Sequence, residues 1–307
     1  MDVLRITHKD KVLFPGSGIT KEELVRYYEK ISNFILPYLK DRPLTMHRFP
    51  SGIDKKGFFQ KNASDYFPDW IRTTKVKKKG GWVNHVICDT RETLVFLVNQ
   101  GVITFHIPLS IVDNLEYPDK LIFDLDPPDD NFRLVVKAAK VLRNFLENDL
   151  GLTTYVMTTG SKGLHIVVPL KATENFEETH DLAKKIAHYL ADQNPKEFTT
   201  DLRKDQRKGR LFIDYLRNSY AQTAVSPFSI RALEGAPVAT PLHWDELDAL
   251  GLDSQAYNIN SIFQRLEQID NPWQDFKQHS KRISSAKNKL KNMGDVWSSN
   301  SETSKST

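Results

Sequence analysis

The segment Leu121-Ile122-Phe123-Asp124-Leu125-Asp126-Pro127-Pro128 decides the fold, because it reads as a buried strand that carries two carboxylates where it ends. Successive side chains of a strand point to opposite faces, so Asp124 and Asp126 share one face, about 7 Å apart along the strand. Two unpaired carboxylates there repel each other and are costly to desolvate. A divalent cation relieves both costs. The segment therefore predicts a Mg²⁺ or Mn²⁺ site, of the kind that most often serves phosphoryl chemistry.

The bulk composition is that of a globular protein able to bury a sizeable core, since 39% of the 307 residues are apolar and 27% are charged. The net charge of +4 is only mildly basic, so nucleic-acid binding requires local patches. The one cysteine, Cys88, fits a buried thiol in a reducing compartment. The N-terminus lacks an apolar signal core, and no window approaches the roughly 20 apolar residues that cross a bilayer. We expect a soluble, cytoplasmic protein without a membrane partner.

Periodic apolar residues and capping signals predict the order of helices and strands. Thr20-Lys21-Glu22-Glu23 is a capping box, and it starts a helix over roughly 20–40 that Pro37 kinks. Asp130 can cap a second long helix. The remaining expectations are strand-rich segments over 44–60 and 82–115, strands over 154–158, 164–168 and 210–214, a helix near 177–192, and a helix whose apolar residues run from Ile259 to Ile269.

The composition changes beyond about residue 276. Six cations occur there before the next acid, Asp295, and Ser298 to Thr307 are rich in serine and threonine. Such a segment cannot bury enough surface to order itself, so we interpret 276–307 as a basic and then Ser/Thr-rich tail or linker. Residues 1–275 are expected to form the catalytic domain, with an N-terminal subdomain over about 1–115 and a metal-binding core over about 116–275.

One strand cannot surround an ion, so a metal site needs an acid from a second segment. Asp214 is the candidate, because it also ends an apolar strand that the same sheet can bring close. Asp-x-Asp occurs by chance as well, and two capping or turn aspartates are the alternative. Asp129 and Asp130 fit that alternative better, since they directly precede a predicted helix.

The segment Thr158-Thr159-Gly160-Ser161-Lys162-Gly163-Leu164-His165 joins two predicted strands and can bind phosphate. Its glycines allow a tight backbone, its hydroxyls and amides donate hydrogen bonds, and Lys162 adds charge, which together suit a triphosphate. The spacing is not that of a P-loop, and an ordinary hairpin turn is the alternative. His165 alternates with apolar neighbours and so faces away from them. His106 is placed similarly, and each is either functional or a structural histidine.

Aromatic and basic side chains mark further candidate sites. Arg48 precedes the pair Phe58-Phe59, whose rings face opposite ways on a strand, so that one can join the core while the other stacks on a base. Two core phenylalanines are the alternative. Two basic runs together suit a phosphate backbone, although solvated loops explain either run alone. The runs are Arg72, Lys75, Lys77, Lys78 and Lys79, and Arg203, Lys204, Arg207, Lys208 and Arg210.

These pieces, in this order from about Lys9 to Leu247, resemble the polymerase module of bacterial DNA ligase D, a primase-polymerase of the archaeo-eukaryotic primase superfamily. Each motif is common by itself, whereas the ordered set is specific. The motifs are Asp10-Lys11-Val12-Leu13-Phe14-Pro15, Thr20-Lys21, Arg48-Phe49-Pro50-Ser51-Gly52, Gly57-Phe58-Phe59-Gln60-Lys61, Phe105-His106, Phe123-Asp124-Leu125-Asp126-Pro127, Gly160-Ser161-Lys162-Gly163-Leu164-His165, Ile213-Asp214-Tyr215 and Ser229-Ile230-Arg231.

The resemblance implies a role for each matching residue. Asp124, Asp126 and Asp214 match the acids that hold two metal ions. Lys11 and Lys21 match the pair that binds the 5′-phosphate of a DNA end, and Lys21 begins a predicted helix, where backbone amides favour an anion. The implied nucleotide-binding set consists of Arg48, Phe58, Phe59, His106, Thr159, Ser161, Lys162, His165 and Arg231.

The chain departs from the family pattern in three places. Thr159 stands where serine is frequent, and the hydroxyl is kept. Gln60 stands where glutamate is frequent, and Arg217 stands where glutamine is frequent. The last two departures concern template or sugar contacts rather than the metal site.

The resemblance implies an α/β (α+β) primase-polymerase fold, with a central, mostly antiparallel sheet flanked by helices and a smaller N-terminal α/β subdomain. It implies a DNA-directed nucleotidyltransferase that uses two Mn²⁺ or Mg²⁺ ions and nucleoside triphosphates, with a preference for ribonucleotides. The implied substrate is DNA with gaps or 5′-phosphorylated broken ends in non-homologous end joining. Ku and a DNA ligase are the implied partners, and the protein would join the nucleoid when bound to DNA.

Two other classes of function remain open from the sequence. A non-catalytic DNA-end-bridging protein would need the basic side chains but not the acids. A haloacid-dehalogenase-like phosphatase also uses Asp-x-Asp after an apolar strand, but its first acid is usually near the chain start and a Thr or Val follows two residues after the second. Here Pro127 and Pro128 follow, more than a hundred residues into the chain.

Overall fold

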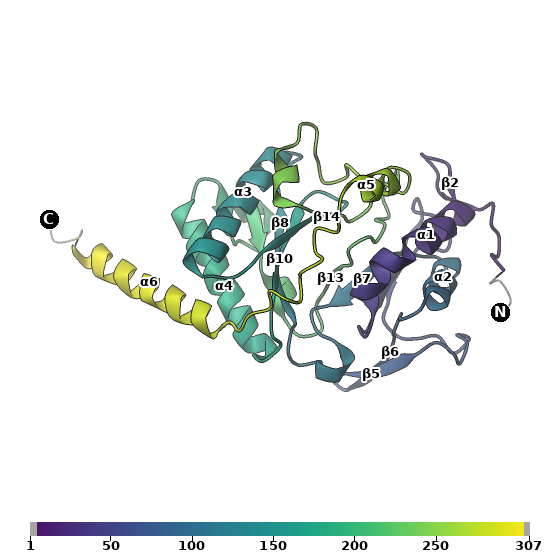
Figure 1. The fold of residues 1–307 in the computed structure, drawn as a ribbon, viewed down its shortest axis with the longest axis horizontal. Coiled ribbons are helices and arrows are strands. Elements are labelled where there is room, and N and C mark those ends of the chain that lie inside the picture. Colours follow the sequence, from purple (N-terminus) through teal and green to yellow (C-terminus); the bar gives the residue numbers. More distant parts are fainter. Residues whose placement is uncertain (1–4, 304–307) are drawn as a thin grey trace. The chain divides into compact units, whose positions relative to one another are not determined.

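The computed structural model of the protein describes residues 5–303, which form two compact units that each contain strands and helices (Figure 1). Unit 1 consists of Met1–Leu115, Met157–Gly163 and Ala221–Gln274, and unit 2 consists of Glu116–Val156, Leu164–Tyr220 and Asp275–Thr307. The boundary after Leu115 coincides with the expected end of the N-terminal subdomain. The segments 157–163 and 221–274 fold with unit 1 rather than with the expected core over 116–275.

Unit 1 is built on an antiparallel sheet of strand order β13-β7-β3-β4, whose members are β3 (Thr45–Arg48), β4 (Phe58–Gln60), β7 (Val102–Pro108) and β13 (Thr223–Val225). Two separate antiparallel pairs are β1 (Val12–Phe14) with β2 (Ile19–Thr20) and β5 (Thr73–Lys78) with β6 (Gly81–Val86). The other elements of unit 1 are α1 (Lys21–Leu39), η1 (Val112–Asn114), α2 (Arg91–Asn99), β14 (Pro241–Leu242), η5 (Trp244–Asp248) and α5 (Ile262–Gln268).

Helix α1 matches its prediction closely. Thr20 caps it: its hydroxyl accepts a hydrogen bond from the Glu23 amide, and the Glu23 carboxylate accepts one from the Thr20 amide. Pro37 lies inside the last turn. The buried face of α1 follows the apolar positions read from the sequence, and it packs against α2 and β7.

Residues 91–99 were expected to be strand-rich and are instead the helix α2. Its N-cap is Thr90, whose hydroxyl accepts a hydrogen bond from the Thr93 amide. All residues from Thr93 to Asn99 are buried, so the helix has no polar stripe. A short apolar run that is buried on every side carries no period by which a helix can be told from a strand.

Tyr28 of α1 explains why the segment 221–274 belongs to unit 1. Its buried hydroxyl donates a 2.5 Å hydrogen bond to the carbonyl of Ile103 and accepts a 3.0 Å bond from the amide of Ile230. The Ser229 hydroxyl in turn accepts a bond from the Phe105 amide. Because buried polar groups need partners, this network fixes the later segment against the N-terminal elements of the same unit.

Unit 2 contains four strands in the order β11-β12-β8-β10, with every pair antiparallel except β11–β12. The strands are β8 (Lys120–Asp126), β10 (Leu164–Pro169), β11 (Phe198–Thr199) and β12 (Leu211–Asp214), and β9 (Tyr155–Thr158) leads the chain from unit 2 into unit 1. Helices α3 (Phe132–Asn144) and α4 (Phe176–Gln193) pack against β8 and β12 (Figure 1). Short helical turns are η2 (Phe145–Asp149), η3 (Lys204–Gln206) and η4 (Leu216–Asn218). The predicted mixed fold with a mostly antiparallel sheet is confirmed.

Two local predictions in unit 2 are wrong. Asn131, not Asp130, caps α3, and its side-chain oxygen accepts a hydrogen bond from the Leu134 amide. The segment after residue 276 is not an unstructured tail, because Lys281 pairs with Leu170 in a β-bridge and the helix α6 (Ser284–Thr303) follows. Ile283, Ala286 and Leu290 are buried, which supplies the apolar surface that the composition did not suggest. Residues 304–307 lie outside the described residues.

Within residues 5–303, no helix has the length and apolar character needed to cross a membrane.

Candidate functional site

Three acidic side chains converge on the sheet of unit 2. Asp124 lies directly opposite Asp214 in the antiparallel pairing of β8 with β12, and Asp126 lies two residues further along β8, opposite Phe212. Directly opposite residues share one face of a sheet, with Cβ atoms about 4.5–5.5 Å apart. The expectation that the sheet brings Asp214 close to the Asp-x-Asp pair is confirmed, while its role as a metal ligand stays a prediction.

His165 of β10 lies on the other side of Asp124, because β10 pairs with β8 in the register His165–Asp124. Its Nε2 atom is 3.5 Å from Asp124 Oδ2, and the ring is buried. The sequence predicted that His165 faces away from its apolar neighbours, and this is correct. The structure thus places His165 beside the acids, whereas the resemblance grouped it with the nucleotide-binding residues.

Burial and mutual repulsion raise the pKa values of two acids. Burial, followed by the charges of Asp124 and Asp214, raises the pKa of Asp126 to about 6. Burial also raises the pKa of Asp214, although its Oδ1 atom accepts a 2.7 Å hydrogen bond from the Leu216 amide. This is the electrostatic cost that the sequence predicted for carboxylates gathered without a cation.

Arg217 contributes positive charge beside these acids. Its guanidinium lies 3.4 Å from Asp124 Oδ2 and 3.9 Å from Asp214 Oδ2. Asn218 holds this turn on β8, because its side chain donates to the Ile122 carbonyl and accepts from the Ile122 amide. The interpretation that the Arg217 departure does not concern the predicted metal site is wrong, because the guanidinium lies beside two of the three acids.

The three carboxylates have the chemistry that Mg²⁺ and Mn²⁺ prefer, which is oxygen donors of high negative charge. In the described part of the chain, no three His, Cys, Asp or Glu side chains are grouped so that they could hold an ion as they stand. The donor set therefore fits a metal chemically, although the side chains are not arranged around an ion in this structure.

In unit 1, Phe58 and Phe59 are both exposed, by 46% and 60%. The expectation that one of them is a core residue is wrong, because β4 is an edge strand of a small sheet and neither of its faces is covered. Each ring contacts the residue opposite it on β3: His47 stacks on Phe59 at 4.0 Å and 13°, and the Arg48 guanidinium lies 5.5 Å from the Phe58 ring. The rings of His106 and Phe59 pack in a T-shaped arrangement, with their centroids 5.5 Å apart.

His47 is a residue that the sequence analysis missed. Burial, and then the charge of Arg231, lower its pKa, which favours a neutral ring against Phe59. The available signal was its place directly before Arg48 on a strand that pairs with the Phe58-Phe59 strand. An exposed aromatic platform with a neutral ring beneath it suits stacking of a nucleic-acid base.

The Thr159–Gly163 turn belongs to unit 1 and contacts Arg231, whose Nη1 donates a 2.8 Å hydrogen bond to the Thr159 carbonyl. Thr159 is buried, and its hydroxyl accepts hydrogen bonds from the amides of Ser161 and Gly163. Thr159 therefore shapes the turn, whereas Lys162 is exposed. Gly160 has φ +66°, and a Cβ there would lie 2.9 Å from Arg231 Cγ, so only glycine fits without displacing the arginine.

Lys11, Lys21 and Arg48 line one hollow of about 220 Å³ in unit 1. Lys11 Nζ donates to the Pro50 carbonyl at 2.6 Å, and Lys21 Nζ donates to the Thr7 hydroxyl at 2.9 Å. Burial, and then the charge of Lys11, lower the pKa of Lys21. The predicted lysine pair is thus brought together, and the structure adds Arg48 to it.

Backbone amides at the start of α1 do not contribute to this hollow. The amide of Lys21 donates to the Lys11 carbonyl, and the amide of Glu22 donates to the Lys9 carbonyl. The Glu23 amide donates to the capping hydroxyl. An anion in the hollow would therefore be held by the cationic side chains. The prediction that backbone amides at the start of the helix also favour the anion is wrong.

The family model of the LigD primase-polymerase domain matches residues 20–273, which contain the three acids and the candidate nucleotide-binding residues. The chain belongs to the LigD primase-polymerase domain family. Domains of this family are nucleotidyltransferases of the archaeo-eukaryotic primase superfamily.

Relatives and solved structures agree with this assignment. The bifunctional non-homologous end joining protein LigD of Bacillus subtilis is 34% identical over 275 residues, 89% of this chain, and the multifunctional LigD of Pseudomonas aeruginosa is 34% identical over 286 residues, 92% of this chain. The chain spans 44% and 34% of the length of these two relatives. The polymerase domain of Mycobacterium tuberculosis ligase D, solved in complex with DNA, superposes with a TM-score of 0.84 at 28% identity, over 91% of this chain and 100% of that domain.

Asp126→Asn should stabilise the metal-free LigD primase-polymerase domain at high pH. The pKa of Asp126 is about 6 in the folded protein and near 3.8 in the unfolded chain, so between these pH values Asp126 is protonated mainly in the folded state. The free energy of unfolding of the unaltered protein therefore falls as pH rises through this interval. Asp126→Asn should raise the free energy of unfolding, relative to the unaltered protein, by roughly 1–2 kcal/mol more at pH 8 than at pH 4.

Urea unfolding in EDTA at both pH values measures this difference. Asp192→Asn, at an exposed position of α4, is the matched control and should change stability little at either pH. An equal gain for Asp126→Asn at pH 4 and pH 8 would contradict the assigned cause.

Proposed function

We propose that this chain is a DNA-directed nucleotidyltransferase that fills gaps and extends 5′-phosphorylated ends during non-homologous end joining. The observation that carries the proposal is the register that sets Asp214 opposite Asp124, with Asp126 on the same strand, in a member of the LigD primase-polymerase domain family. A structural relative solved with DNA supports the choice of substrate.

The candidate residues differ in the chemistry that they can supply. In unit 2, Asp124, Asp126 and Asp214 would hold two Mn²⁺ or Mg²⁺ ions, which when bound supply acidity for the primer 3′-hydroxyl and neutralise triphosphate charge. In unit 1, Phe59 offers a stacking surface for the incoming base, and Lys162 and Arg231 carry charge suited to its phosphates. Ribonucleotides and Mn²⁺ are the forms that the family resemblance favours.

The remaining assignments follow from this substrate. The protein would act where the chromosome lies, in the cytoplasm on the nucleoid. Proteins that hold broken ends or seal the filled gap, such as Ku and a DNA ligase, are the partners that the proposed reaction requires. The pair Lys11 and Lys21 would select ends, since a terminal phosphate carries more charge than an internal diester.

The unaltered protein should extend a primer across a short gap that carries a 5′-phosphate. The assay supplies Mn²⁺ or Mg²⁺ in turn, each with ribonucleoside or deoxyribonucleoside triphosphates. Asp124→Ala should lower the extension rate by at least about a hundredfold, because it removes one of the three carboxylates that would hold the ions. Gel analysis of extended primers measures the rate, and fluorescence anisotropy checks that DNA binding is retained. Binding without any extension by the unaltered protein would instead favour the end-bridging alternative.

Arg217→Gln should bind Mn²⁺ more tightly, by roughly threefold to tenfold, because the guanidinium competes with the ion for Asp124 and Asp214. Isothermal titration of Mn²⁺ measures this affinity without any reaction. Arg217→Lys keeps the charge and should resemble the unaltered protein, and Lys184→Gln on α4 controls for net charge. Equal affinity in the glutamine variant and the unaltered protein would rule out this competition.

Lys11→Ala combined with Lys21→Ala should abolish the preference for a 5′-phosphate over a 5′-hydroxyl at the gap. Both side chains line the same hollow, so removing them takes away its charge while leaving the Asp124 region untouched. Competition binding with the two kinds of gapped duplex measures the preference. If the unaltered protein binds both ends equally, the hollow has no such role.

A further inference from the structure

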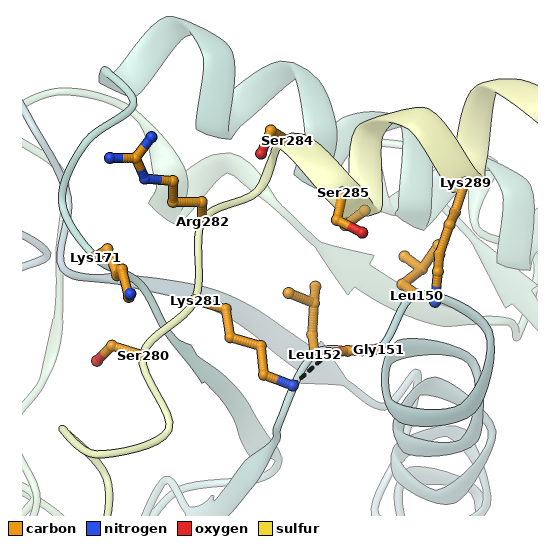
Figure 2. A pocket seen from close by; sticks show the side chains of 11 residues that line it. Leu150, Gly151, Leu152, Lys171, Ser280, Lys281, Arg282, Ser284, Ser285 and Lys289 are labelled. Carbon is orange, nitrogen blue, oxygen red and sulfur yellow. Dashed lines mark hydrogen bonds between the residues drawn. The ribbon is translucent and has the colours of Figure 1, made fainter.

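A second basic hollow lies in unit 2, far along the chain from the lysine hollow of unit 1. It measures about 460 Å³ and is bordered by the segment that follows β10, the loop around Gly151 and the start of α6 (Figure 2). Four cationic side chains line it, Lys171, Lys281, Arg282 and Lys289, together with the hydroxyls of Ser284 and Ser285. We call this hollow the α6 pocket. The roles assigned above use none of these residues.

Backbone contacts fix the segments that form the α6 pocket. The Lys171 amide donates to the Lys281 carbonyl, and the Lys281 amide donates to the Pro169 carbonyl. The Lys281 side chain crosses the hollow and donates a 2.7 Å hydrogen bond to the Gly151 carbonyl. The cations are therefore presented by an ordered frame rather than by a loose tail.

Gly151 also sets the position of Lys289. It has φ +73°, and a Cβ at this residue would lie 3.2 Å from Lys289 Nζ. The absence of a side chain thus lets the lysine approach the same loop that Lys281 reaches. Ser285 and Lys289 are one turn apart on α6, so they face the same side of the helix.

The positive charge of the α6 pocket has no matching acid. None of its lining residues is an aspartate or glutamate, and among the described residues Lys171, Arg282 and Lys289 form no ion pair. The first turn of α6 adds to this charge: Ile283, which precedes the helix, has no polar side-chain atom with which to cap it. All four cations are exposed, so water screens their repulsion, and an anion that reaches the pocket can contact several of them at once.

The α6 pocket is separate from the acidic cluster of the same unit. His165 and Lys171 are six residues apart on and just beyond β10, so they lie about 20 Å from each other along the strand direction. A ligand in the pocket is therefore not a nucleotide bound at the acids.

We propose that the α6 pocket is a second DNA-binding site, which holds backbone phosphates of duplex DNA away from the reacting end. Lysine and arginine side chains that converge from separate segments, with hydroxyls between them, suit phosphate oxygens without reading sequence. The choice of DNA as the source of the phosphate rests on the proposed function.

The test compares Lys171→Gln combined with Lys289→Gln against the control Lys184→Gln combined with Lys196→Gln, which removes two exposed lysines of unit 2 outside the pocket. Duplex binding is measured by anisotropy from 50 to 300 mM salt. Each lost phosphate contact lowers the slope of log affinity against log salt by about 0.9, so the pocket variant should lose about 1.8. The control should keep the slope of the unaltered protein, and both variants should keep the extension rate at low salt.

The second arm follows the amide signals of Ser284 and Ser285 by NMR while duplex DNA or inorganic phosphate is added. Shifts with duplex together with the lower slope support the proposal. Shifts with phosphate alone, at an unchanged slope, assign the pocket to a small free anion and overturn it, as does the absence of any shift. If the unaltered protein does not bind duplex DNA at all, the proposed function is wrong as well. If it binds duplex DNA and the pocket variant keeps the same salt slope, only the role of the α6 pocket is wrong.

Discussion

The pairing of β8 with its two neighbours is the constraint on which the acidic site depends. Because β8 pairs with β12 and β10 in one register, Asp124 lies opposite both Asp214 and His165. A shift of one residue in either pairing would turn the opposite side chain to the other face of the sheet, where Leu125 and Ile213 are buried. The apolar face thus fixes the register, and the register in turn brings the carboxylates together at the expense of raised pKa values.

Charge of one sign gathers without full compensation in three places. The carboxylates of unit 2 repel each other, burial and then the charge of Lys11 lower the pKa of Lys21 in unit 1, and the α6 pocket holds four cations. Burial and repulsion disfavour the charged forms in the acidic cluster and at Lys21, whereas water screens the exposed cations of the α6 pocket. The ligands proposed above are of opposite sign to each cluster: metal ions for the acids and phosphates for the two basic hollows. Stability is therefore lowered at the two sites where the proposed metal ions and 5′-phosphate would bind.

The sequence predicted those features that depend on neighbours along the chain. The capping box at Thr20, the strand that carries Asp124 and the strand that ends at Asp214 all follow from local pattern. Features set by distant packing were not predictable. Helix α2 is buried on all sides, β4 leaves both phenylalanines exposed because it lies at an edge, and residues 221–274 join unit 1 through Tyr28. The segment that leads into α6 likewise pairs through Lys281 with Leu170, over a hundred residues earlier in the chain.

Arg217 shows how a single departure from a family pattern gains meaning only from three-dimensional context. As a sequence difference it was assigned to template or sugar contacts rather than to the metal site. In the structure, Asn218 ties that turn to β8, so the guanidinium is held against Asp124 and Asp214 rather than left in solvent. A neutral glutamine at the same place would leave the acids to repel each other until cations arrive. The arginine instead lowers that repulsion before any cation binds, because its guanidinium contacts the carboxylates that the proposed cations would use. The same contact therefore lowers the repulsion among the carboxylates and would compete with the proposed metal ions for Asp124 and Asp214.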